Sequence, residues 1–126
     1  KVGGKVIGVD TDQSPVIDAA YGEGMTITSA MKGLAPTTID TLTDVVMNGN
    51  WANYAGKIQT LGLVSADPEA NYVQIPMEST QWADTFTQED YKALVAGMFD
   101  GSIVVSNDIG AMPAVSYAIN VYPDIK

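Results

Sequence analysis

Two aspartates and a lysine stand directly after two apolar runs of the chain. The run at residues 6–9 stops at Asp10 and Asp12, and the run at residues 25–31, MTITSAM, leads into Lys32. A carboxylate in such a place could attack a phosphate, help to hold a metal ion, accept hydrogen bonds from sugar hydroxyls, or cap a turn. A neighbouring ammonium would offset its charge and donate to the same ligand.

The composition narrows these choices. The 126 residues carry six Lys, no Arg and fifteen acidic residues, for a net charge of -9, and they include no His and no Cys. The negative charge makes nucleic acid a poor partner. Without His or Cys, the chain alone cannot build a serine triad, a cysteine–histidine dyad or most catalytic zinc sites. Carboxylate chemistry, a hard metal ion on oxygen ligands, a catalytic Lys, and binding without reaction stay open.

The hydrophobic pattern predicts alternating strands and helices within one domain. We expect one helix over residues 36–48, where Pro36 suits the first turn and Gly49 the end. A second helix should follow Thr87 as its N-cap and end at Gly101. Residues 14–24 are expected to form a loop with at most one helical turn, because Pro15, Gly22 and Gly24 punctuate them. Strands are expected at 6–9, buried on both faces, and at 25–31, 57–64, 71–77 on an edge, 102–106 and 114–122.

This order favours an α/β fold, a mostly parallel sheet flanked by helices. In such sheets ligands bind outside the carboxyl ends of the strands. The predicted ends of the first two strands carry Asp10, Asp12 and Lys32, so we expect acid and base to meet at one edge.

Several stretches also resemble one known family. The segments GKVIGVDTDQS, MTITSAMK, TLTDVVMNGNW, TLGLV and TQEDYKALVAGMFDGSIVVSND follow one another between residues 4 and 108 in an order similar to the basic membrane protein family, the nucleoside-binding lipoproteins of bacterial ABC transporters. The resemblance implies a type I periplasmic-binding-protein fold, with two α/β lobes and a nucleoside held between them. Residues 1–126 then look like a single lobe, most of the second one, and a C-terminal fragment of a two-lobe protein.

The resemblance further implies a function and a site. The chain would be the substrate-binding component of a bacterial ABC transporter, outside the cytoplasm, as a periplasmic or lipid-anchored protein. It would bind a nucleoside, with a purine nucleoside favoured, through Asp10 and Lys32, and would deliver it to a permease. Its partners would be the nucleoside, the permease and the first lobe; no enzymatic activity, cofactor or metal ion is implied.

Two other functions remain open at this point. Asp10 and Asp12 match the DxD signature that follows a hydrophobic strand in haloacid-dehalogenase-type phosphatases, where one Asp attacks phosphorus. A ligand-sensing lobe of a regulator would share the fold and the Asp10 contact, since a fold alone does not fix a function.

Other residues have structural interpretations that we prefer to functional ones. Asp12 is expected to cap a turn, and Gln13 and Ser29 are polar neighbours with structural roles. The two tryptophans, Trp51 and Trp82, are expected to pack against the sheet rather than stack on a base. The acidic pair Asp40 and Asp44 is expected to form a solvated helix face.

Overall fold

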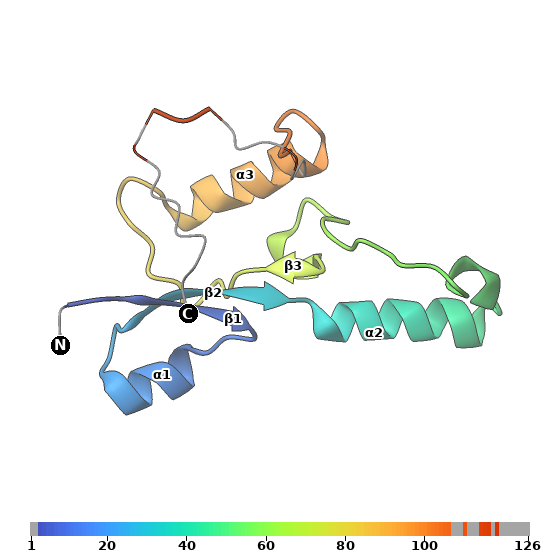
Figure 1. The fold of residues 1–126 in the computed structure, drawn as a ribbon, viewed down its shortest axis with the longest axis horizontal. Helices are drawn as coiled ribbons and strands as arrows, with labels where there is room; N and C mark the ends of the chain where they lie inside the picture. The colour runs from blue at the N-terminus through green and yellow to red at the C-terminus, as the bar shows by residue number, and fades with distance from the viewer. Residues whose placement is uncertain (1–2, 107–109, 111–113, 117, 119–126) are drawn as a thin grey trace.

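The computed structural model describes residues 3–106, 110, 114–116 and 118 of the chain. In chain order the regular elements are β1 (Val6–Asp10), α1 (Ser14–Tyr21), β2 (Thr26–Lys32), α2 (Leu34–Leu42), β3 (Val73–Gln74) and α3 (Gln88–Phe99). Short helical turns at Thr43–Met47, Trp51–Asn53 and Pro68–Ala70 complete them. Helices α1 and α3 lie on opposite sides of the sheet, whereas α2 runs away from the end of β2 (Figure 1).

The described strands form one mixed sheet in the order β1-β2-β3. Strands β1 and β2 are parallel, and β3 pairs antiparallel with the end of β2. The predicted α/β class is therefore confirmed, but the described sheet is mixed rather than mostly parallel. In the parallel pair Asp10 stands opposite Met31, so Lys32 lies one residue beyond it.

The predicted loop at residues 14–24 is wrong over most of its length, because residues 14–21 form α1. Pro15 is the cause of the error. It occupies the first turn of the helix, where its missing N–H has no intrahelical partner to lose. Gly22, with a φ of 116°, then ends the helix.

The helix predicted at residues 36–48 is present, although it begins two residues earlier and changes its winding. The α-helix α2 continues into a π-helical turn, Thr43–Met47. Gly49 follows with a φ of 71°, a left-handed conformation that glycine adopts without strain. The predicted end of the helix at Gly49 is thus confirmed.

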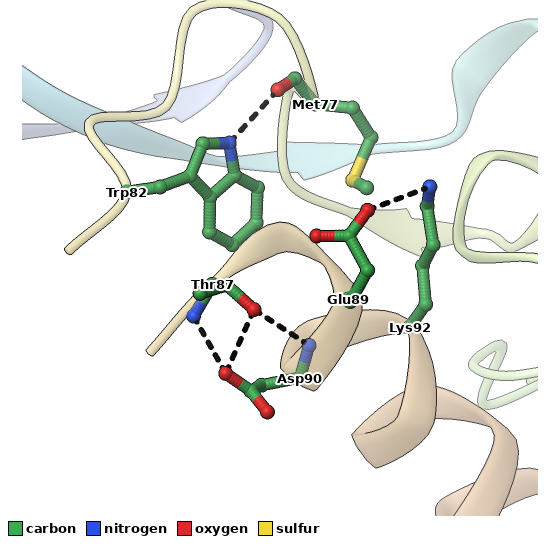
Figure 2. A network of polar contacts seen from close by, with 6 residues as sticks. All are labelled: Met77, Trp82, Thr87, Glu89, Asp90 and Lys92. Atoms are coloured by element: carbon green, nitrogen blue, oxygen red, sulfur yellow. Dashed lines mark hydrogen bonds and ion pairs between the residues drawn. The ribbon is translucent and has the colours of Figure 1, made fainter. Parts of the chain in front are cut away.

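Helix α3 begins as the sequence predicted. The Thr87 hydroxyl accepts from the Asp90 amide, and the Asp90 carboxylate accepts from the amide and hydroxyl of Thr87 (Figure 2). This capping box satisfies backbone groups that the first helical turn leaves without partners. Just before the helix, the Trp82 indole N–H donates to the Met77 carbonyl, and the Trp82 ring packs 5.7 Å from the ring of Tyr91.

Three strands that the hydrophobic pattern predicted are not found among the described residues. Residues 57–64 and 102–106 form no strand. At residues 114–122 the described part, 114–116 and 118, is not a strand either, and the remainder lies outside the described residues. An apolar run becomes a strand only where its backbone groups pair with a neighbouring strand, and within the described residues none of these runs pairs with the sheet. The predicted edge strand at 71–77 is present only as the two residues of β3.

Burial also departs from expectation at β1. Its side chains Ile7 and Val9 are 67% and 54% exposed, whereas the sequence predicted a strand covered on both faces. Strand β1 is an edge strand of the described sheet, and no described element packs over these two side chains. Among the described residues, the most deeply buried side chains are instead polar: Thr26, Ser29 and Asn71.

Candidate functional site

The carboxyl ends of β1 and β2 bring Asp10 and Lys32 together, as the sequence predicted for these strand ends. The Lys32 Nζ lies 2.8 Å from Asp10 Oδ1, and both side chains are more than half exposed. An exposed ion pair contributes at most about 1 kcal/mol to stability, so the pair is not needed to hold the fold. The remaining ammonium donors of Lys32 and the unused lone pairs of the Asp10 carboxylate are presented to solvent at one edge of the sheet.

The backbone at Asp10 has an unusual conformation. Its φ is +72°, and it is the only non-glycine residue with a positive φ in the described part of the chain. The left-handed conformation is costly for residues with a Cβ and is found most often for Asn and Asp among them. The chain thereby turns sharply at the exact residue that pairs with Lys32.

Asp12 is placed differently from Asp10. Its Oδ1 accepts from the Ser14 amide at 3.0 Å and the Ser14 hydroxyl at 2.8 Å, and its Oδ2 accepts from the Ser79 hydroxyl at 2.7 Å. Burial raises the pKa of the Asp12 carboxyl, but the hydrogen bonds from Ser79 and Ser14 outweigh that effect and lower it. The predicted turn-capping role is confirmed, and the carboxylate also joins the start of α1 to residue 79.

The main chain after Lys32 is fixed by the segment that enters β3. The Gly33 amide donates to the Tyr72 carbonyl at 2.8 Å, and Lys32 pairs with Val73. The Tyr72 hydroxyl donates to Asp40 Oδ2 at 2.6 Å, a bond that, with partial burial, raises the pKa of Tyr72. Contacts from β3 and α2 therefore meet beside Lys32.

The expected solvated face fits the positions of Asp40, which is exposed, and Asp44, which is only partly covered, but both carboxylates also accept hydrogen bonds. Asp40 accepts the bond from Tyr72, and Asp44 accepts from the side chains of three asparagines beyond the helix, Asn48, Asn50 and Asn53. The hydrogen bond from Asn50 contributes most to lowering the pKa of Asp44, and it outweighs desolvation, which acts in the opposite direction. Asp44 therefore binds the start of the segment that follows the helix, at residues 48–53, and Asp40 binds its end, at Tyr72.

The two tryptophans have different positions. Trp82 packs against Tyr91 of α3, and its indole N–H donates to the Met77 carbonyl, so its contacts are structural but are made with α3 and a loop rather than with the sheet that was expected. Trp51 is 63% exposed on a short helical turn, so the expectation that it packs against the sheet is wrong.

An apolar cleft of about 430 Å³ lies between α3 and the sheet. Its walls include Ala30, Leu63, Val73, Val95 and Met98. Polar groups that would orient a ligand are few there, because the amide nitrogen of the lining residue Gln74 already donates to the carbonyls of residues 69 and 71. The cleft thus offers apolar volume but little polar recognition.

Sequence reasoning missed two residues that shape the site. Asn71, fully buried, makes four hydrogen bonds to the backbone of residues 64, 65 and 67 and so builds the loop that leads into β3. Ser79 reaches Asp12 across 67 residues of sequence. An isolated Asn or Ser in a polar stretch carries no periodic signal, and nothing in the sequence marks either one.

Comparison with known proteins leaves the family open. Family models, curated proteins and solved structures give no match to this chain. In the part that the structure describes, no helix has the length and apolar character needed to cross a membrane. No group of three or more His, Cys, Asp or Glu side chains is arranged to hold a metal ion among those same residues.

Proposed function

We propose that the chain binds a ligand with vicinal hydroxyls, a nucleoside held through its ribose, at Asp10 and Lys32. The single observation that carries the proposal is their 2.8 Å ion pair, exposed at the carboxyl ends of two adjacent parallel strands. Ligands of open α/β sheets bind at this edge.

The chemistry of the pair suits a diol. The two carboxylate oxygens of Asp10 can each accept from one of two neighbouring hydroxyls, and the ammonium of Lys32 can donate to a hydroxyl oxygen. Hydrogen bonds to charged groups contribute about 1.5–3 kcal/mol each, so two or three of them account for selective binding of a small polar ligand. A ligand that enters also keeps the two opposite charges adjacent, which limits the cost of removing them from water.

On this proposal the chain acts as one lobe of a substrate-binding protein of a bacterial ABC transporter, related to the basic membrane protein family. A second lobe would close over the ligand, and the closed form would be recognised by a permease outside the cytoplasm. The exposure of Asp10 and Lys32 supports this proposal, because one lobe leaves most of a bound ligand in contact with water.

The phosphatase alternative has less support from the geometry. A DxD mechanism needs the second carboxylate available beside the first, but both oxygens of Asp12 already accept hydrogen bonds from Ser14 and Ser79. A sensory lobe of a regulator would share the fold and the Asp10 contact, and it would differ in its partner.

Isothermal titration calorimetry of the intact protein tests the proposal. Adenosine, inosine and guanosine should bind, and their 2′-deoxy forms should bind more weakly because one hydroxyl of the diol is lost. Asp10→Ala and Lys32→Met should each lower the affinity at least about tenfold, a change of about 1.4 kcal/mol. Lys92→Met is the matched control, because Lys92 forms an exposed ion pair with Glu89 on α3, remote in sequence from the strand ends. Unchanged affinity in Asp10→Ala would remove the assignment.

A further inference from the structure

The left-handed conformation of Asp10 requires an explanation beyond the residue itself. A residue with a Cβ adopts a positive φ at an energetic cost, and it does so persistently only where surrounding contacts hold it there. Asp10 is exposed, and in the described part of the chain the polar contact of its side chain is the ion pair with Lys32, so this side chain does not supply that restraint. The restraint must come from the backbone on either side.

Gln13 contacts the backbone on the near side of Asp10. Its side-chain Oε1 accepts from the Val9 amide at 3.0 Å. The Gln13 side chain therefore closes a ring over residues 9–13, with Asp10 inside it.

Gln13 is itself held in place. The main-chain amide of Gln13 donates to the Ser29 hydroxyl at 3.1 Å, and Ser29 is fully buried on β2. Gly8 leaves the space that this arrangement needs, since a Cβ there would lie 2.5 Å from Ser29 Oγ and 2.9 Å from Gln13 Oε1. A second short bond, from the Thr11 amide to the Val9 carbonyl at 2.9 Å, tightens the same turn.

We infer that Gln13 is a positioning residue: its main-chain amide is bonded to Ser29, and its side chain, in the space beside Gly8, holds Asp10 in the left-handed conformation that directs its carboxylate to Lys32. The inference deepens the proposed function. Only its second part, the effect of Gln13 on ligand binding, rests on that proposed function. The conformational part concerns this chain alone and can be measured without a ligand.

Nuclear magnetic resonance of the labelled chain tests the conformation directly. A positive φ shortens the distance between the amide and α protons of one residue, so Asp10 should show a much stronger intraresidue nuclear Overhauser effect than Val9. Gln13→Met keeps the length of the side chain but removes the acceptor, and it should weaken that signal several-fold at Asp10. Gln13→Glu keeps an acceptor and should restore it, and Gln59→Met, an exposed position, should leave it unchanged.

Each outcome decides the matter. A weak signal at Asp10 in the unaltered chain, or a signal that persists undiminished in a folded Gln13→Met variant, overturns the inference. If Gln13→Met does not fold, the double variant with Asp10→Gly is measured, because glycine adopts a positive φ without strain. Recovery of folding in the double variant supports the inference, and failure to recover overturns it.

The binding consequence is read separately with adenosine as the probe. Gln13→Met should lower the affinity about tenfold, and Gln13→Glu should retain most of it. If the unaltered protein binds no ribonucleoside, the proposed function fails, whereas the resonance experiment still decides whether Gln13 positions Asp10. If adenosine binds equally well to Gln13→Met, the positioning role has no consequence for binding and the inference is refuted in that respect.

Discussion

Replacing Asn71 by alanine should destabilise the protein strongly, although the residue is small and polar. Its side chain is fully buried. Its Oδ1 accepts from the amides of Val64 at 2.7 Å and Ser65 at 2.9 Å, and its Nδ2 donates to the carbonyls of Ser65 at 3.1 Å and Asp67 at 2.8 Å. All four hydrogen-bonding positions of the amide are thus filled by backbone groups of one loop.

The expected magnitude follows from those four bonds. Each contributes roughly 1 kcal/mol net, and each partner left buried and unpaired costs about the same or more. Water that enters the vacated space restores part of this loss. We therefore expect the free energy of unfolding of Asn71→Ala to fall by about 2–4 kcal/mol, which for a chain of this size lowers Tm by roughly 8–15 °C.

Urea denaturation followed by tryptophan fluorescence is the assay, because Trp82 packs against Tyr91 in the folded chain. Asn53→Ala is the matched control. Asn53 is exposed, and its side-chain Nδ2 donates one hydrogen bond, to Asp44 Oδ2 at 3.3 Å. That variant should change stability by less than about 0.5 kcal/mol. A loss in Asn71→Ala no larger than in the control would show that the loop does not depend on the buried amide.

The same substitution should loosen the site. Asn71 precedes Tyr72, whose carbonyl accepts from the Gly33 amide next to Lys32. Hydrogen exchange at the Gly33 amide should therefore become faster in Asn71→Ala, while exchange within α3 should change less. Equal acceleration at both places would indicate only global destabilisation.

Two further predictions concern packing and acid stability. Gly33→Ala would put a Cβ 2.5 Å from the carbonyl oxygen of Asn71, so thermal denaturation should show a loss of about 1–3 kcal/mol. Gly62→Ala, where no atom lies within 4 Å of the added Cβ, should cost far less. The lowered pKa of Asp12 means that its contribution to stability is present above about pH 4 and is lost as the pH falls through the folded-state pKa. Ser79→Ala removes one of the bonds that lower this pKa, so urea midpoints at pH 3 and pH 7 should differ less than in the unaltered protein; an unchanged difference would contradict the assigned cause.

The elements with strong local signals were predictable. Thr87 and the apolar spacing behind it predicted α3, and Gly49 predicted where the second helix ends, because capping and left-handed glycine depend on a few adjacent residues. Pro15 misled the prediction at α1, since proline is equally compatible with a turn and with the first turn of a helix. The candidate site followed from the same local logic: two strand ends were recognised, and parallel pairing placed Asp10 and Lys32 together.

The sequence could not predict which apolar runs would find a partner strand. Residues 57–64 have a strand-like pattern, but they pair with neither β1 nor β3, the two outer strands of the described sheet. Strand pairing is a long-range choice among competing edges, and local propensity holds little information about it. The exposure of Ile7 and Val9 has the same origin, because burial depends on what lies across the sheet.

The sequence by itself determined the charge, the residue types open to chemistry, the capped helix α3 and the acid and base at two strand ends. The tertiary structure alone decided that the sheet is mixed, that Asp12 is tied to Ser79, and that Asp10 has a left-handed backbone held beside Lys32. The physical reason is range. Caps and helical periods arise from neighbours within a few residues, whereas the register of strands and the partners of buried polar groups are fixed only when distant segments meet.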